Sequence, residues 1–219
     1  MPKGKPLSRR KFIKVAAGAL GAGAVVCGGS VFLGLRTPPG VLFPRSACPY
    51  SGGKKVLVAY ASKCGATAEI ADHITQSLCS SGLQADLMPA GSVKDIQAYA
   101  AVVLGSAIYM GKPLTEAQRF AEKYLAVQSQ IPAALFNVSL SMKDNTPEGV
   151  QTAMSYMQPL IAHVKPVLVG LFAGRIDMQT LPPLYRLFAQ SDSQGILAEG
   201  DYRDWQQIDA WQADLQKTL

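Results

Sequence analysis

The stretch SKCGAT, Ser62 to Thr67, lies between an apolar run and an amphipathic run. If the second run is a helix, its first backbone N–H groups lack partners within the helix and stand at the positive end of its dipole. Gly65 would let the backbone approach a ligand closely. The segment therefore predicts a phosphate-binding turn. The alternative is a plain helix cap by Ser62 or Thr67. The residues expected at the phosphate are Ser62, Lys63, Cys64, Gly65, Ala66 and Thr67.

Two other segments of short polar side chains follow apolar runs. They are GSAIYMGK, Gly105 to Lys112, and SLSMKDN, Ser139 to Asn145. Tyr109 could stack on a planar ring, although an isolated tyrosine of this kind is more often an ordinary buried aromatic. Taken together, the three segments predict a site for a flat phosphorylated ligand. The further residues expected at the ligand are Ser106, Ala107, Ile108, Tyr109, Met110, Gly111, Ser139, Leu140 and Ser141.

The elements that must position these segments alternate between β-rich and helical patterns from residue 54 onward. The alternation predicts an α/β fold, a doubly wound parallel sheet of five strands in the order 2-1-3-4-5 with helices on both faces. In such a sheet the loops after strands one, three and four open at one edge. The expected strands cover 55–60, 84–88, 101–105, 133–139 and 166–172, and the expected helices cover 67–81, a segment opened by Pro113, 147–159 and 204–219.

Three stretches carry a resemblance to a known family. They are VLVAYASKCGATAEIA, AVVLGSAIYMGK and GDYRDWQQIDAW. They resemble the flavodoxin-like family that includes menaquinone-dependent protoporphyrinogen oxidase, over about residues 54–219. The resemblance implies FMN, with 62–67 at its phosphate and with 107–111 and 139–141 at its isoalloxazine ring. Cys64 departs from the family pattern, because flavodoxins often have Thr there.

The resemblance also implies an activity. It suggests a flavin oxidoreductase that passes electrons from an organic donor, with a tetrapyrrole as the family's example, to a quinone. The alternative is an electron carrier that serves a redox partner protein and has no substrate of its own. No catalytic acid or base is assigned, since neither His73 nor His163 belongs to a plausible triad.

An insert at about residues 175–200 favours the enzyme, because simple flavodoxins lack it. Its apolar side chains could cover core, or could form a lip for a quinone, a tetrapyrrole or a membrane. Arg175, Lys143 and Arg186 could then meet substrate carboxylates. The apolar side chains are Leu181, Leu184, Tyr185, Leu187 and Phe188.

Cys64 raises the rival prediction of a low-molecular-weight tyrosine phosphatase. Such an enzyme needs an arginine six positions on, where this chain has Ile70, so the phosphatase is disfavoured. The four cysteines have no metal-ligand spacing, and no metal site is expected. An exported chain could form a disulfide, but the sequence does not select the pair.

Charge is distributed unevenly along the chain. The net charge is +6, yet residues 1–45 hold eight of the 21 Lys and Arg and no acidic residue. Residues 46–219 therefore carry 13 basic against 15 acidic side chains, and no nucleic-acid partner is expected.

The basic N-terminal segment resembles a twin-arginine export signal. SRRKFIK, Ser8 to Lys14, precedes an uncharged run from Val15 to Leu35 that is long enough to span a bilayer. An ordinary membrane anchor is the alternative. Residues 1–36 are thus expected to be a signal or anchor, 37–53 a linker, and 54–219 the domain. This predicts a domain at the outer face of the cytoplasmic membrane, in the periplasm or at the cell surface.

Overall fold

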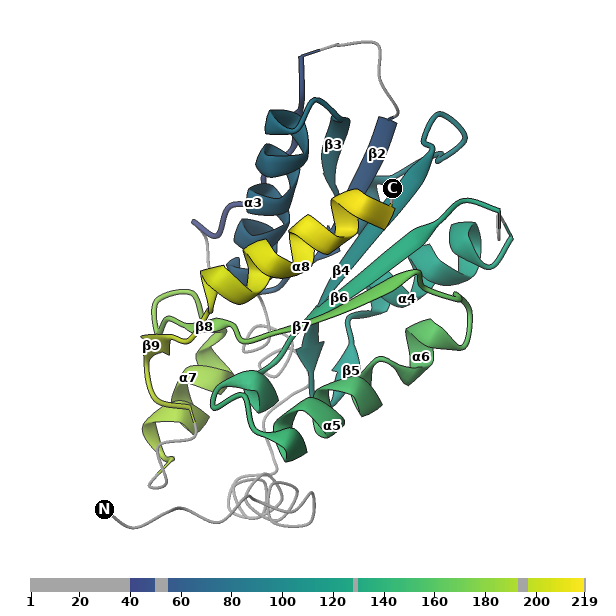
Figure 1. Cartoon of the computed structure of the whole chain (residues 1–219). Coiled ribbons are helices and arrows are strands. Elements are labelled where there is room, and N and C mark those ends of the chain that lie inside the picture. The colour runs from purple at the N-terminus through teal and green to yellow at the C-terminus, as the bar shows by residue number, and fades with distance from the viewer. Residues whose placement is uncertain (1–39, 50–54, 128–129, 193–196, 219) are drawn as a thin grey trace.

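A parallel sheet forms the centre of the molecule in the computed structural model, which describes residues 40–49, 55–127, 130–192 and 197–218 (Figure 1). Its parallel strands lie in the order β3-β2-β4-β6-β7. This is the order 2-1-3-4-5 in chain sequence, so the predicted fold class is confirmed. The strands are β2 Lys55–Ala61, β3 Gln84–Pro89, β4 Ala101–Tyr109, β6 Ala133–Val138 and β7 Leu168–Phe172.

Two short antiparallel strands extend this sheet to seven, where the sequence predicted five. β1, Ser46–Ala47, pairs with the outer edge of β3. β5, Lys112–Pro113, folds back on β4 through a turn at Met110 and Gly111, which have φ of 51° and 76°. Positive φ at both turn residues suits a two-residue hairpin. Pro113, expected to open a helix, therefore lies in a strand.

Helices cover both faces of the sheet, as predicted (Figure 1). On one face lie α3 and α8, and on the other lie α4, its π-helical continuation η2, α5 and α6. Thr146 caps α5 by accepting the Gly149 N–H at 3.1 Å, and Pro147 takes the first helical position. The bounds are α3 Ala66–Ser80, η1 Ala90–Ser92, α4 Thr115–Phe120, η2 Ala121–Leu125, η3 Leu140–Met142, α5 Pro147–Tyr156, α6 Gln158–Ile161 and α8 Trp205–Thr218.

Successive side chains of a strand point to opposite faces of the sheet, so the core consists of two layers. Val56, Val58 and Tyr60 of β2 pack towards α3 and α8. Leu57 and Ala59 pack towards the opposite helices. Because helices bury both faces of the sheet at β2, the sequence of this strand is an almost continuous apolar run, as expected for a central parallel strand.

The insert forms a separate small unit between β7 and α8. β8, Arg175–Ile176, pairs antiparallel with β9, Gly200–Asp201, and α7, Pro183–Gln190, lies between them. No residue of α7 is buried. Leu184, Tyr185 and Phe188 are partly buried, whereas Leu187 is exposed, so both interpretations of the insert remain open.

A disulfide joins the segment before β2 to the domain. Cys48 is bonded to Cys79 of α3, with 5.6 Å between their Cα atoms. This settles the pairing that the sequence left open, and Cys64 is the free cysteine of the described residues. Within the described ranges no helix is long and apolar enough to cross a bilayer. The predicted signal or anchor, residues 1–36, lies outside those ranges.

Candidate functional site

Register brings the three predicted loops to one edge. Tyr60 is paired with Gly105 and Ala61 with Ser106, so β2 ends beside Ser106, three residues before the end of β4. Ala107 is paired with Val138 at the end of β6. The carboxyl ends of β2, β4 and β6 are therefore neighbours, and the segments that follow them start side by side.

The first loop leaves the start of α3 open. Gly65 is the N-cap residue with φ 94°, and no side chain caps the helix. Ser62 instead accepts the Gly65 N–H at 3.1 Å and so stabilises the turn itself, while Thr67 is buried inside the helix. The alternative of a plain cap by Ser62 or Thr67 is thus wrong. The first-turn N–H groups of α3 keep their capacity to bind an anion.

Lys63 and Cys64 differ in what they offer. The Lys63 Nζ lies 4.0 Å from the centroid of the Tyr109 ring, which links the first loop to the end of β4. Burial raises the pKa of the Cys64 thiol to about 11, so the thiol stays protonated at neutral pH. Ile70, where a phosphatase needs arginine, is fully buried. Both observations disfavour the phosphatase.

The second predicted loop is largely a strand. β4 continues to Tyr109, so Ser106, Ala107, Ile108 and Tyr109 belong to it, contrary to expectation. The Ser106 hydroxyl accepts the Leu114 N–H at 3.0 Å and donates to the Ala107 carbonyl at 2.9 Å. This hydroxyl therefore holds the β4–β5 hairpin in place.

Tyr109 meets the insert. Its ring centroid lies 4.8 Å from that of Tyr185 in α7. Its hydroxyl is buried, with Tyr185 as its polar neighbour. Burial, and after it the neighbouring Tyr185, raises the pKa of Tyr109 above the usual range. Beyond it, Met110 is 73% exposed at the hairpin tip, followed by Gly111.

The third predicted loop is tightly held. Ser139 donates its N–H to the Phe172 carbonyl at 3.0 Å, and its hydroxyl lies 2.8 Å from that of Ser141. A Cβ at Gly149 would lie 2.2 Å from the Ser141 carbonyl oxygen, so α5 packs directly on the loop. Gly149 was not among the predicted residues, although it belongs to the helix-start motif NTPEG. Leu140 is partly exposed between the two serines.

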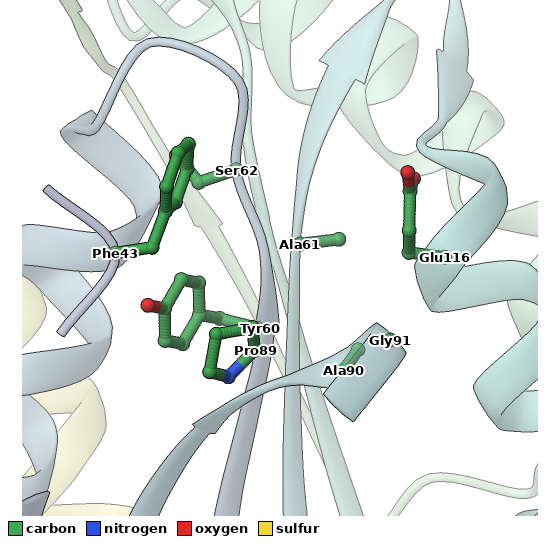
Figure 2. A pocket seen from close by; sticks show the side chains of 8 residues that line it. All are labelled: Phe43, Tyr60, Ala61, Ser62, Pro89, Ala90, Gly91 and Glu116. Atoms are coloured by element: carbon green, nitrogen blue, oxygen red, sulfur yellow. The ribbon is translucent and has the colours of Figure 1, made fainter. Parts of the chain in front are cut away.

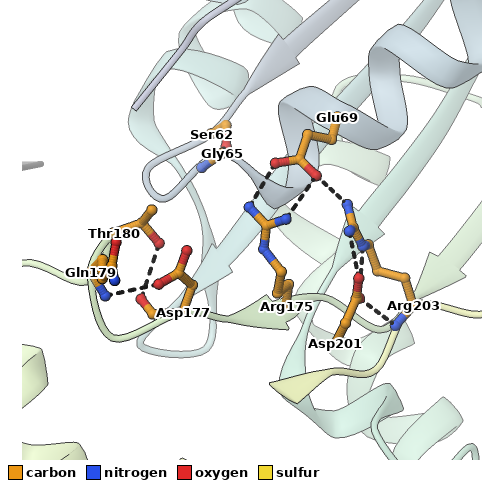
Figure 3. Close-up of polar contacts among 9 residues, drawn as sticks. All are labelled: Ser62, Gly65, Glu69, Arg175, Asp177, Gln179, Thr180, Asp201 and Arg203. Carbon is orange, nitrogen blue, oxygen red and sulfur yellow. Dashed lines mark hydrogen bonds and ion pairs between the residues drawn. The ribbon is translucent and has the colours of Figure 1, made fainter. Parts of the chain in front are cut away.

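An ion-pair network joins the insert to α3 beside the first loop (Figure 3). Glu69 accepts from Arg175 at 2.7 Å and from Arg203 at 2.6 Å, and Arg203 also pairs with Asp201 at 2.5 Å. The sequence did not reveal this network, since Glu69 and Arg203 are 134 positions apart. The two arginines and the two carboxylates of this network balance, so it adds no net charge beside the first loop.

The three cations expected to meet substrate carboxylates are not gathered. Arg175 is paired with Glu69. Arg186 donates to the Gln179 carbonyl at 3.2 Å within its own insert. The Lys143 Nζ lies 4.3 Å from the centroid of the Tyr202 ring. We therefore assign no carboxylate-binding cluster to these residues.

A pocket of about 180 Å³ lies beyond the ends of β2 and β3 (Figure 2). It shares only Ser62 with the predicted ligand residues, and pockets for whole small ligands usually measure roughly 300–1,000 Å³. It is therefore distinct from the three-loop site and too small for a flavin nucleotide. Its lining residues are Phe43, Tyr60, Ala61, Ser62, Pro89, Ala90, Gly91 and Glu116.

Comparison with known families supports the architecture. A family model described as a flavodoxin domain matches residues 57–191, more than half of the chain. The chain belongs to the flavodoxin domain family. The matched part of this flavodoxin domain extends from β2 through α7, so it includes all three loops and most of the insert.

Individual relatives are more distant. Protoporphyrinogen IX dehydrogenase [quinone] of Escherichia coli K12 is 26% identical over 168 residues, which cover 70% of this chain and 90% of that protein. A mutant flavodoxin of Pseudomonas aeruginosa is 18% identical, covering 75% and 98% of the two chains, with a TM-score of 0.46. A Fusobacterium nucleatum flavodoxin bound to flavin mononucleotide is 14% identical, covering 76% and 99%, with a TM-score of 0.46.

Proposed function

We propose that this protein is an FMN-dependent oxidoreductase that transfers electrons from an organic donor to a quinone at the outer face of the cytoplasmic membrane. The observation that carries the proposal is the alignment of three ligand-type segments at one sheet edge, next to a helix N-terminus that no side chain caps. Membership of the flavodoxin domain family supports it.

The residues present fit FMN. In this proposal the first-turn N–H groups of α3 hold the phosphate, with Gly65 allowing close approach and Lys63 adding positive charge. The backbone of 107–111 and 139–141 meets the ring, and the buried hydroxyl of Tyr109 is a further polar group at that place. Bound flavin supplies reversible electron transfer, while the protein fixes its position and surroundings.

The insert favours an enzyme over a simple electron carrier. Tyr185 of α7 contacts Tyr109, so the insert reaches the residues assigned to the ring. No residue of the amphipathic helix α7 is fully buried, and its Leu187 is 57% exposed, which leaves this side chain for another surface or molecule. The similarity to a protoporphyrinogen IX dehydrogenase that uses quinone makes a tetrapyrrole donor the first substrate to test.

Export is the second part of the proposal. The motif SRRKFIK followed by an uncharged run to Leu35 is typical of twin-arginine signals, a route that carries folded, cofactor-loaded proteins. The disulfide between Cys48 and Cys79 supports an oxidising compartment. In this proposal residues 15–35 hold the domain at the membrane.

The activity is tested with purified, FMN-loaded full-length protein. Oxidation of protoporphyrinogen IX is measured with and without a menaquinone analogue, under air and under anaerobic conditions. The proposal predicts quinone-dependent turnover well above that of free FMN. Turnover equal to that of free FMN, by protein that has bound the flavin, would instead make it an electron carrier.

A variant with a shortened insert tests whether the insert is needed for quinone-dependent turnover but not for FMN binding. Ile176 of β8 faces Gly200 of β9, so replacing residues 177–199 by Asn-Gly leaves the register of a two-residue hairpin. This variant should retain FMN and lose quinone-dependent turnover. A matched control, Gly82→Asn, alters an open positive-φ turn at the far end of α3 and should keep both FMN and quinone-dependent turnover. Unchanged quinone kinetics in the shortened protein would remove the insert from the mechanism.

A further inference from the structure

We propose that the sheet edge carrying the three loops is the face of the domain that rests on a phospholipid bilayer. This inference builds on the proposed function, because it takes residues 15–35 as the membrane segment. It adds the orientation of the domain and names the surface that contacts lipid.

The chain reaches the domain at this edge. A Cβ at Gly65 would lie 3.5 Å from the Val41 Cγ1, so residue 41 lies against the first loop. Tyr60, at the end of β2, donates its hydroxyl proton to the Pro44 carbonyl at 2.8 Å. Figure 2 shows Phe43 beside Ser62. The segment 40–44 thus passes along the carboxyl ends of β2 and β3.

This segment is fastened in place. Arg45 donates to the Ser92 hydroxyl at 2.6 Å, β1 pairs with β3, and Cys48 is bonded to Cys79. Five Cα steps separate Leu35, the end of the apolar run, from Gly40. Such a length spans at most about 18 Å when fully extended. A bilayer that holds residues 15–35 would therefore lie close to the loop edge.

Exposed apolar side chains from four segments lie at the same edge. They come from the segment 40–44, the β4–β5 hairpin, the loop after β6, and α7. We call them the apolar rim: Leu42, Phe43, Met110, Leu140 and Leu187, exposed by 81%, 40%, 73%, 37% and 57%. Side chains of this kind penetrate the lipid headgroup region when a domain is held against it. Together with the short tether, they favour lipid over a soluble partner.

The orientation has a chemical consequence. A quinone dissolved in the bilayer would meet Tyr109, Tyr185 and the three loops without first crossing water. The insert would then form the side of the site nearest the lipid, which agrees with an amphipathic α7 that buries none of its residues.

Fluorescence quenching by lipids with brominated acyl chains tests this orientation in the full-length protein. Leu187→Trp places a probe on the apolar rim, and Val127→Trp places a matched probe at the opposite edge, where Val127 is 76% exposed. The protein is reconstituted in phosphatidylcholine and phosphatidylglycerol vesicles, and the signal of the unsubstituted protein is subtracted. We expect quenching at position 187 to exceed that at 127 by at least about twofold.

Several outcomes would overturn the inference. Equal quenching at both positions, or stronger quenching at 127, places a different face on the membrane. If the fluorescence at position 187 escapes quenching and changes with protein concentration rather than with lipid, the apolar rim contacts a second copy of the chain instead. Leu42→Trp serves as a second rim probe should Leu187→Trp fold poorly. Flavin absorbance is recorded on the same samples. It shows whether FMN is bound, so a failure of membrane contact can be told apart from a failure of FMN binding.

Discussion

The strand frame and the insert meet at one site but are built differently. In the frame, β2, β4 and β6 are buried on both faces, and glycines permit close contacts such as that of Gly105 with Phe136. In the insert, α7 has no fully buried residue, and Arg175 and Arg203 link it to Glu69 of α3 by ion pairs. We infer that the frame fixes the cofactor site, whereas the insert governs what approaches it.

The two regions should also differ in local stability. Partly exposed ion pairs contribute little to stability, typically about 0–1 kcal/mol each. The insert should therefore open at a lower free energy than the frame, without loss of the sheet. The following predictions test this contrast.

The largest effect is expected in the frame. A Cβ at Gly105 would lie 2.0 Å from the Phe136 Cζ in the closed core. Gly105→Ala should lower the free energy of unfolding by about 3 kcal/mol through overpacking. Urea unfolding measures this, with Gly91→Ala as control, since its nearest contact would be 3.6 Å from a flexible Glu116 side chain. If both variants lost the same free energy of unfolding, the account of Gly105 as a closely packed position in the frame would be wrong.

The next effect concerns the phosphate turn. Gly65 and Gly82 flank the two ends of α3 and have similar positive φ of 94° and 86°. Alanine at either position should strain the backbone, but only Gly65→Ala should also weaken FMN binding, by about tenfold. Flavin titration followed by fluorescence compares the two variants. Equal affinities would argue against phosphate binding at this turn.

On the insert side, Tyr185→Leu removes the ring contact with Tyr109. Because an aromatic pair contributes about 0.5–1.5 kcal/mol, quinone-dependent turnover should fall several-fold, while FMN affinity changes by less than about threefold. Steady-state kinetics and flavin titration measure both. Gln190→Ala, a change at an exposed position of the same helix, is the control. A larger loss of FMN affinity than of turnover would place α7 in the cofactor frame instead.

The smallest effect is a pH dependence of the insert. The hydrogen bond from Arg203 lowers the pKa of Asp201 below its usual 3.8. The folded state is therefore stabilised by the ionised Asp201 above pH 3.8, and this contribution is lost as pH falls through the lowered pKa. Hydrogen exchange of β8 and β9, corrected for intrinsic rates, should accelerate at such pH in the natural protein. In Asp201→Asn this acceleration should be weaker, and an unchanged pH profile would contradict the assignment.

The sequence was sufficient to predict the parallel frame, because most of its strands are apolar runs and the connections after β2, β4 and β6 have helical periodicity. The start of α5 was likewise predicted from NTPEG, where cap and proline act locally. The β4–β5 hairpin was missed because it requires positive φ at Met110, a conformation that side chains other than glycine rarely adopt.

The missed contacts depend on long-range geometry. The Cys48–Cys79 bond and the Glu69–Arg203 pair join segments that no local pattern connects. For the site, the sequence identified the segments but not the roles within them. Ser106 proved to hold the hairpin, and Tyr185 reached Tyr109 only through the fold of the insert.

The central claim is that the three loops at the edge of β2, β4 and β6 bind FMN. Equilibrium titration of the flavin-free, folded full-length protein with FMN tests it most directly, by absorbance and by quenching of flavin fluorescence. The account predicts saturable binding of one FMN per chain, weakened by Gly65→Ala and not by Gly82→Ala. Folded protein that takes up no FMN would contradict it.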